Sequence, residues 1–431
     1  MDEAMKVRRA TYHLYTFTVS KVISTFGSSV YAFGISLYIL ALTGSAASFA
    51  LNLICSILPR AVMAPFAGYA ADRYPKKVVV ILSQTISIVS VGGLLVYSIT
   101  AGLSLAAIYT ATALVSASSM FTSVAFSSAI ANLIDPDRIQ RAMGFNQSAV
   151  AIATIGGPVV GGMLFGFVSI HTFLTIQVAA YSIAVVMEAT MDFQLFTRRL
   201  KENLTKADKT VRESMKEGIF YVKSNRPVMV IVTVALGVNF FFSALMIGLP
   251  FIAVQQLGVK ATHFGFIEGM IAGGMLLASV YFSIRKEVKF PLLFAKRGVL
   301  SMAVLLSGLG LPLIIELPYP VMVSFYLMLM LTFGITNVFV NTPIGVMIQK
   351  EVVEEYRGRV LGIVESMAMA MMPLGYLLFG LLFDLMPAEY VVISSSVCLI
   401  LMTNYLMRPS VLEEAHPDLA AATQIRSSLQ K

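Results

Sequence analysis

A short polar stretch, GYAADRYPKK at residues 68–77, follows a long apolar run. Its acid, Asp72, could pair with the N-terminus of a neighbouring helix or with an arginine. Gly68, four residues earlier, would let a second helix approach closely. The bases that would hold the stretch at an anionic surface are Arg73, Lys76 and Lys77. The spacing predicts a latch whose charges pair in one conformation and separate in another. If Lys76 is lost, Lys77 is expected still to anchor the loop.

Three ionisable residues lie far inside apolar runs, where a charge is costly and marks a proton or ion pathway. They are Arg60, Glu268 and Glu365. Arg60 is about 18 Å from Asp72 along a helix, which is near the centre of a membrane span. We expect Glu365 to be the principal proton-coupling group, because burial inside the span would control its proton affinity. Glu268 is the competing candidate.

Other ionisable residues of the apolar segments have a simpler interpretation. The Lys21 ammonium can extend to the membrane surface along its aliphatic stem. Glu188 and Asp192 lie close to the end of an apolar run, from which they can reach the interface. We therefore expect no role inside the membrane for these three side chains.

The composition excludes an ordinary soluble protein. The 431 residues are 57% hydrophobic and only 13% charged, whereas soluble domains carry about 25% charged residues. Helical spans need about 20 mostly apolar residues, while strands of a membrane barrel would be short and alternating. The sequence therefore predicts an all-α polytopic membrane protein. Both cysteines, Cys55 and Cys398, fall inside apolar runs, which does not support a disulfide framework.

Twelve apolar runs predict transmembrane helices, six on each side of one long polar interval. The first six runs cover residues 14–42, 46–71, 78–99, 103–131, 141–167 and 172–194. The second six cover residues 228–255, 262–284, 291–315, 319–348, 359–383 and 388–407. The predicted domains are an N-terminal six-helix bundle at 1–194, a linker at 195–227, a C-terminal six-helix bundle at 228–408 and a tail at 409–431.

The two halves also contain similar segments. Residues 134–145 (IDPDRIQRAMGF) and 350–363 (KEVVEEYRGRVLGI) are both acidic-basic loops that run into a glycine-rich helix with a proline. Parallel six-helix repeats are a recurrent plan of transporters, which hold the substrate between the halves near the middle of the membrane.

Charge placement predicts the orientation. Most of the 31 Lys and Arg residues lie at the N-terminus, in alternate loops, in the linker and in the tail, whereas Lys260 is on the opposite side. Because basic loops stay in the cytoplasm, both termini are predicted to be cytoplasmic in a multi-pass protein of the cell membrane. The net charge of +8 reflects this topology and does not imply a nucleic-acid partner.

The loop at 68–77 resembles the signature of the major facilitator superfamily, G-x-L-A-D-R-x-G-R-K. The matching residues are Gly68, Ala71, Asp72, Arg73, Lys76 and Lys77, while Ala70 and Pro75 depart from it. The resemblance covers the chain to about residue 408 and implies the fold of that family. It also implies that spans two and eleven adjoin, which would bring Arg60 near Glu365.

The fifth predicted span carries a second motif, similar to the antiporter motif of drug exporters. Its small residues would let helices pack closely, and its proline would permit a kink. The matching residues are Gly144, Ala153, Gly157, Pro158, Gly161 and Gly162, with alanine at 153 in place of a glycine. Ordinary small-residue packing is the alternative. The fourth span has no charged residue, so the proton relay of many such exporters is not carried over.

The resemblance further implies that spans one, four, seven and ten line a substrate cavity. They offer aromatic surface with dispersed amides and hydroxyls, which suits amphiphilic compounds. The candidate residues are Tyr31, Ser116, Thr122, Asn239, Phe240, Asn337 and Asn341. The asparagines could instead bond to neighbouring helices.

These features predict a secondary active transporter that exports hydrophobic or amphiphilic small molecules, including drugs such as macrolides, in exchange for protons. Siderophore or lysolipid export and nutrient uptake are the alternatives within transport. No catalytic, metal or phosphate-binding motif points to an enzyme, and no cofactor is predicted. The expected partners are the small-molecule substrate, protons and the lipid bilayer, and the expected state is a monomer.

Overall fold

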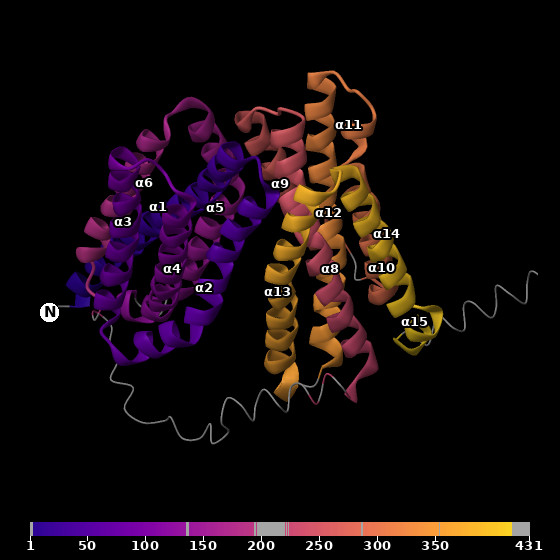
Figure 1. Cartoon of the computed structure of the whole chain (residues 1–431). Coiled ribbons are helices and arrows are strands. Elements are labelled where there is room, and N and C mark those ends of the chain that lie inside the picture. Colours follow the sequence, from indigo (N-terminus) through magenta and orange to yellow (C-terminus); the bar gives the residue numbers. More distant parts are fainter. Residues whose placement is uncertain are drawn as a thin grey trace, which may run out of the picture. The chain divides into compact units, whose positions relative to one another are not determined.

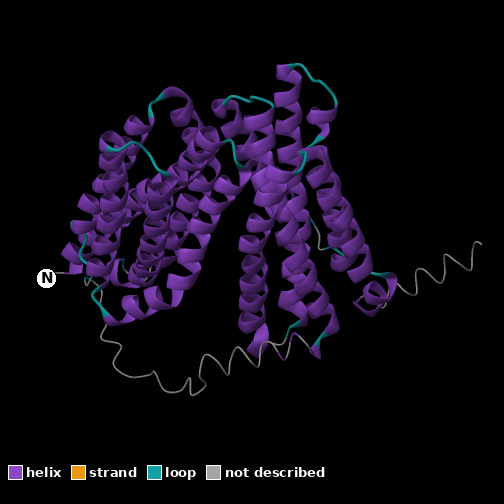
Figure 2. Cartoon of the chain, viewed as in Figure 1, coloured by secondary structure: helices purple, strands orange, loops and turns teal. Residues whose placement is uncertain are grey.

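The computed structural model describes residues 3–134, 138–193, 195, 220, 222, 224–285, 288–352 and 354–415. Most of the predicted linker and the tail beyond residue 415 lie outside these ranges. The side chains of Asp72 and Glu365 are also outside the described part, although both residues are helical. The described residues form helices and loops without a strand (Figure 2).

Six long helices make up the first half of the chain, and each contains the core of one predicted span. They are α1 (Glu3–Thr43), α2 (Ala46–Arg73), α3 (Lys76–Thr100), α4 (Leu105–Leu133), α5 (Ile139–Phe167) and α6 (Ile170–Ala189). Serine N-caps start several of them: the Ser45 hydroxyl accepts a hydrogen bond from the Ser48 amide, and Ser104 does the same for Ala107.

The second half repeats this series with more interruptions. Its helices are α8 (Arg226–Pro250), the π-helix η2 (Phe251–Gln256), α9 (Ala261–Ile284), α10 (Pro291–Gly308), α11 (Leu311–Ile314), α12 (Tyr319–Glu351), α13 (Glu354–Leu385), α14 (Ala388–Leu406) and α15 (Pro409–Ala415). Eleven spans of the described chain are long and apolar enough to cross a membrane, and α13 adds a shorter apolar part, Ala370–Leu385. The predicted all-α fold with its succession of spans is confirmed.

The chain divides into two compact units. The first comprises Met1–Lys201 together with Val259–Gly269, and the second comprises Glu202–Gly258 and Met270–Lys431. The division near residue 201 falls inside the predicted linker. The assignment of Val259–Gly269, the start of α9, to the first unit was not predicted. It arises because Gly162 and Gly265 let the backbones of α5 and α9 touch: a Cβ on Gly265 would lie 2.5 Å from the Pro158 carbonyl oxygen.

Each unit packs its helices in the same pattern. In the first unit α1 packs on α5 and α6, and α3 packs on α4 and α6 (Figure 1). In the second unit α8 packs on α13 and α14, and α10 packs on α12 and α14. Helix α8 thus takes the place of α1, and α13 takes the place of α5. This correspondence supports the internal repeat inferred from the loops that precede α5 and α13.

Glycines set the closest of these helix contacts. A Cβ on Gly157 of α5 would lie 2.6 Å from the Cβ of Ser29 on α1. In the second unit a Cβ on Gly375 of α13 would lie 2.7 Å from the Cβ of Ser243 on α8. Because no carbon can sit so near another unbonded carbon, these positions require glycine for the observed packing.

The start of the predicted tail is part of the second unit. Val411 and Leu412 of α15 are buried in the apolar core formed by α8, α10, α12 and α14. The Arg226 guanidinium donates to the Glu414 carboxylate at 2.8 Å, although both side chains are exposed and the pair contributes little. Apolar burial is therefore the main attachment of α15.

Candidate substrate cavity and polar sites

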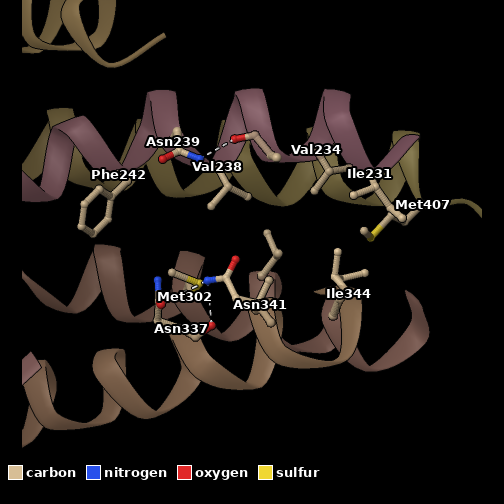
Figure 3. A pocket seen from close by; sticks show the side chains of 14 residues that line it. Ile231, Val234, Val238, Asn239, Phe242, Met302, Asn337, Asn341, Ile344 and Met407 are labelled. Carbon is tan, nitrogen blue, oxygen red and sulfur yellow. Dashed lines mark hydrogen bonds between the residues drawn. The ribbon is translucent and has the colours of Figure 1, made fainter. Parts of the chain in front are cut away.

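A cavity of about 180 Å³ lies inside the second unit, between α8, α10 and α12 (Figure 3). A cavity of about 150 Å³ is enough to hold one benzene ring, so this one has room for an aromatic or branched aliphatic group. All the residues that line it are uncharged. They are Ile231, Val234, Ala235, Val238, Asn239, Phe242, Ala295, Val299, Met302, Asn337, Val340, Asn341, Ile344 and Met407.

Three of the predicted substrate residues meet at this cavity. Asn239 comes from α8, while Asn337 and Asn341 come from α12, as Figure 3 shows. The Asn239 amide donates to the Ala235 carbonyl oxygen at 2.9 Å, and the Asn341 amide donates to Asn337 Oδ1 at 3.1 Å. Each amide also has further donor or acceptor capacity, which a ligand can use. The site combines apolar surface with a few fixed polar groups, as small-molecule sites do.

Phe240 differs from the prediction, because its ring faces α13 and not the cavity. Its centroid is 5.3 Å from that of Phe379 on α13. The aromatic ring that lines the cavity is that of Phe242, which the sequence analysis missed. The spacing of three residues between Asn239 and Phe242, which puts them on one helix face, was the available signal.

The candidates from the first unit are packed in its interior. Tyr31 is buried in the core between α1, α3, α4 and α6. The Ser116 hydroxyl donates to the Ser56 carbonyl oxygen, and the Thr122 hydroxyl donates to the Ser118 carbonyl oxygen at 3.2 Å. These bonds satisfy both hydroxyls within the protein, so the structure does not bring the three residues together at a described cavity.

The two lysines of the loop at 68–77 hold two different helices. Lys76 Nζ donates to the Ser128 carbonyl oxygen near the end of α4 at 2.5 Å. Lys77 Nζ donates to the carbonyl oxygen of Ala189, the last residue of α6, at 2.6 Å. The bond of Lys77 is favourable because the last carbonyl groups of a helix lack intrahelical partners and carry a partial negative charge. Because the two lysines bind different helices, these contacts do not support the expectation that Lys77 can take over from Lys76.

Lys76→Ala and Lys77→Ala are each expected to lower the stability of the purified protein by about 1 kcal/mol, since each removes a charge-assisted hydrogen bond. The effects should add in the double variant, because Lys76 binds α4 and Lys77 binds α6. Thermal unfolding in detergent measures this. If both single variants were as stable as the wild type and only the double variant were destabilised, one lysine would be able to anchor the loop without the other.

The other residues of the loop have fewer contacts in the described structure. Arg73 is exposed and lies over the Tyr69 ring, 5.9 Å from its centroid. A Cβ on Gly68 would meet nothing within 4 Å among the described residues. The close helix approach predicted at Gly68 stays a prediction.

The second motif divides into residues that touch other helices and one that does not. Gly157 and Gly161 face α1, and Gly162 faces the start of α9. Ala153 is buried, and Pro158 lies inside α5, which continues through it. Gly144 has nothing within 4 Å of an added Cβ in the described part of the chain. The motif therefore acts as a packing surface from Ala153 to Gly162.

The ionisable residues inside the spans have contrasting surroundings. Arg60 is exposed on α2, and Glu268 is partly buried on α9. Lys21 and Glu188 are 6% and 0% exposed, which contradicts the expectation that they reach the membrane surface. Asp192, in contrast, is exposed as expected. Glu188 is buried because α1 extends beyond the end of α6 and covers it. The Tyr12 hydroxyl of α1 bonds to Thr190 Oγ1 at 2.9 Å.

Comparison with known proteins identifies the family. The sequence profile of the Major Facilitator Superfamily matches residues 17–376, which is most of the chain. The chain belongs to the major facilitator superfamily. The resemblance inferred from the loop at 68–77 is confirmed, and the protein is a membrane-embedded transporter of small molecules and not an enzyme.

Superfamily members with related sequences include exporters. The chain is 21% identical over 370 residues to macrolide efflux protein A of Streptococcus pyogenes, covering 86% of this chain and 89% of that protein. It is 21% identical over 401 residues to the staphyloferrin A transporter of Staphylococcus aureus, covering 91% and 96%. The crystal structure of the nucleoside transporter NupG superposes with a TM-score of 0.70 at 15% identity, covering 92% and 98%, which supports the fold alone.

Proposed function

We propose that this major facilitator protein exports hydrophobic or amphiphilic small molecules by alternating access, in exchange for protons. The uncharged cavity of the second unit is the observation that carries this proposal. Its lining offers apolar and aromatic surface with the amides of Asn239, Asn337 and Asn341. Such a site can bind an apolar group and orient a polar one, but it offers no opposite charge to a strongly ionic substrate. The relationship to macrolide efflux protein A supports export.

An everted-vesicle assay with a panel of amphiphilic dyes, with and without a pH gradient, tests the proposal. Dye uptake into the vesicles should require the gradient. Asn239→Leu and Asn341→Leu should each raise KM about fivefold, which corresponds to the loss of one hydrogen bond of about 1 kcal/mol. Asn404→Leu, on an exposed position of α14, is the matched control. Absence of uptake for every dye would reject the substrate class.

Siderophore export is the second candidate, favoured by the relationship to the staphyloferrin A transporter. Lysolipid export and nutrient uptake are the remaining alternatives. The same vesicles distinguish these functions if the panel includes a ferric chelate, a lysolipid and a nucleoside. Uptake in right-side-out vesicles, but not in everted ones, would reverse the proposed direction.

Proton coupling is proposed to involve Glu365 of α13, paired with Arg60, with Glu268 of α9 as the competitor. A carboxyl inside a span is costly when charged and can therefore exchange a proton as its surroundings change. Glu365→Gln should bind dye but lose accumulation driven by the pH gradient. Normal pH-dependent transport by this variant would transfer the coupling role to Glu268 or to another carboxyl.

Both termini and the linker are proposed to face the cytoplasm, as the distribution of Lys and Arg indicates. In a background without Cys55 and Cys398, Ser45→Cys and Ala101→Cys should react with an impermeant thiol reagent added to intact cells. Asn203→Cys in the linker should not react. Ala101 is preferable to Gly102, whose φ of +77° disfavours a side chain. Labelling at residue 203 in sealed cells would reverse the topology.

A further inference from the structure

A carboxylate is fully buried inside the first unit, near the end of α6. Glu188 is 0% exposed. Its Oε1 atom accepts a hydrogen bond from Gln84 Nε2 of α3 at 3.3 Å. Its Oε2 atom is buried and has no hydrogen-bond partner in the described structure. An ionised carboxylate with an unsatisfied oxygen is unfavourable in such a place, unless it can take up a proton.

One buried cation faces this carboxylate. Lys21 of α1 is 6% exposed, and its ammonium interacts electrostatically with Glu188. The Lys21 Nζ atom also lies 5.8 Å from the centroid of the Phe126 ring on α4, which stabilises the cation. Lys21 and Glu188 do not form an ion pair within 4.0 Å among the described contacts. The carboxylate is therefore near a positive charge but does not form a direct ion pair with it.

The other ionisable groups around the end of α6 contact partners other than Glu188. From α3, Lys77 donates to the Ala189 carbonyl oxygen, and from α1, His13 Nε2 accepts from the Asp192 amide at 3.4 Å. At the start of α5, Arg138 donates to Thr11 and Arg141 lies over the Phe145 ring. On α2, Arg60 interacts electrostatically with Lys21 and not directly with Glu188. Lys21 is thus the cation that acts on Glu188.

We propose that Glu188, Lys21 and Gln84 form a proton-binding site inside the first unit, with the proton on the Oε2 atom of Glu188. Proton uptake forms one O–H bond and converts the carboxylate to a neutral carboxylic acid. Gln84 keeps its hydrogen bond to Oε1 in both forms, and Lys21 remains an ammonium. The site therefore changes from neutral to singly positive when it is occupied.

The position of the site determines the side from which protons enter. Glu188 is the residue before Ala189, which ends α6. The loop lysine Lys77 binds that helix end, so the site exchanges protons with the side on which the loop at 68–77 lies. As a part of transport, this role rests on the proposed proton coupling. Proton binding itself does not depend on it.

Infrared difference spectroscopy tests the site in the full-length protein reconstituted in liposomes. The carbonyl-stretch band of a protonated carboxyl should disappear as the pH is raised. Glu188→Gln, which keeps the shape and the bond to Gln84, should remove this component. Glu316→Gln, which changes an exposed carboxyl between α11 and α12, is the control and should retain it. An unchanged band in Glu188→Gln would overturn the proposal.

Lys21→Met provides an independent arm, because it removes the facing cation and keeps the apolar stem. The pH midpoint of the Glu188 band should shift, because the facing positive charge is gone. An unchanged midpoint would overturn the assignment of Lys21 to the site.

Dye export measured on the same proteins separates the proton-binding site from the proposed proton-coupled export. If the band titrates while wild-type export does not depend on the pH gradient, the result supports the proton-binding site and rejects proton-coupled export. If export needs the gradient but the band does not depend on Glu188, the site fails.

Discussion

Gly157→Ala is expected to abolish most transport and to lower the stability of the protein by about 1–3 kcal/mol, as over-packing of a close contact does. The added methyl carbon would lie 2.6 Å from Ser29 Cβ and 3.3 Å from the Ser29 carbonyl carbon. A rotation of the Ser29 side chain cannot relieve contacts with these two atoms. Helices α1 and α5 would therefore have to separate. Dye export and thermal unfolding in detergent measure the two effects.

Gly144→Ala is the matched control, because Gly144 belongs to the same motif and the same helix. A Cβ there would meet nothing within 4 Å in the described structure. Alanine favours a helix over glycine by about 1 kcal/mol, so this variant should be as stable as the wild type or slightly more stable.

A second-site variant tests the cause of the Gly157 effect. Ser29→Gly removes both side-chain atoms of Ser29 and should restore export and stability to Gly157→Ala. Wild-type behaviour of Gly157→Ala on its own would show that the contact between α1 and α5 can widen without consequence. Failure of Ser29→Gly to rescue a damaged protein would place the clash elsewhere.

Asp72→Asn is expected to remove most transport while leaving expression and stability nearly unchanged. Asp72 is the penultimate residue of α2, where the negative end of the helix dipole disfavours an acid. A neutral amide should therefore not destabilise this helix end. We expect the Asp72 carboxylate to act by pairing with a positive charge in one state of the transport cycle. Dye export by everted vesicles and thermal unfolding give the two readouts.

Asp384→Asn is the control for this second prediction. Asp384 is also the penultimate residue of its helix, α13, and its side chain is exposed. It lies outside the signature loop, so the same change should leave transport intact. Equal losses from both variants would indicate a general effect of acids at helix ends. Wild-type transport by Asp72→Asn would reduce the loop to a determinant of topology.

The sequence by itself determined the order of the spans and the positions of most of their ends. Apolar runs end where loops and charges begin, so the predicted span 46–71 became Ala46–Arg73 and the predicted span 262–284 became Ala261–Ile284. Both the six-plus-six arrangement and the family signature are local properties of the chain. The amides of Asn337 and Asn341 could also be placed in advance, since they are four residues apart on one helix face.

Only the tertiary structure decided which face of each helix meets which neighbour. Phe240 and Phe242 are equivalent in composition, but the rotation of α8 directs the first toward Phe379 and the second into the cavity. Gly144 and Gly157 belong to one motif, but only Gly157 faces α1. Glu188 is close to a helix end and yet buried, because α1 is 41 residues long and covers it. Hydropathy describes each segment separately, whereas burial depends on helix length, rotation and contact with residues more than a hundred positions away.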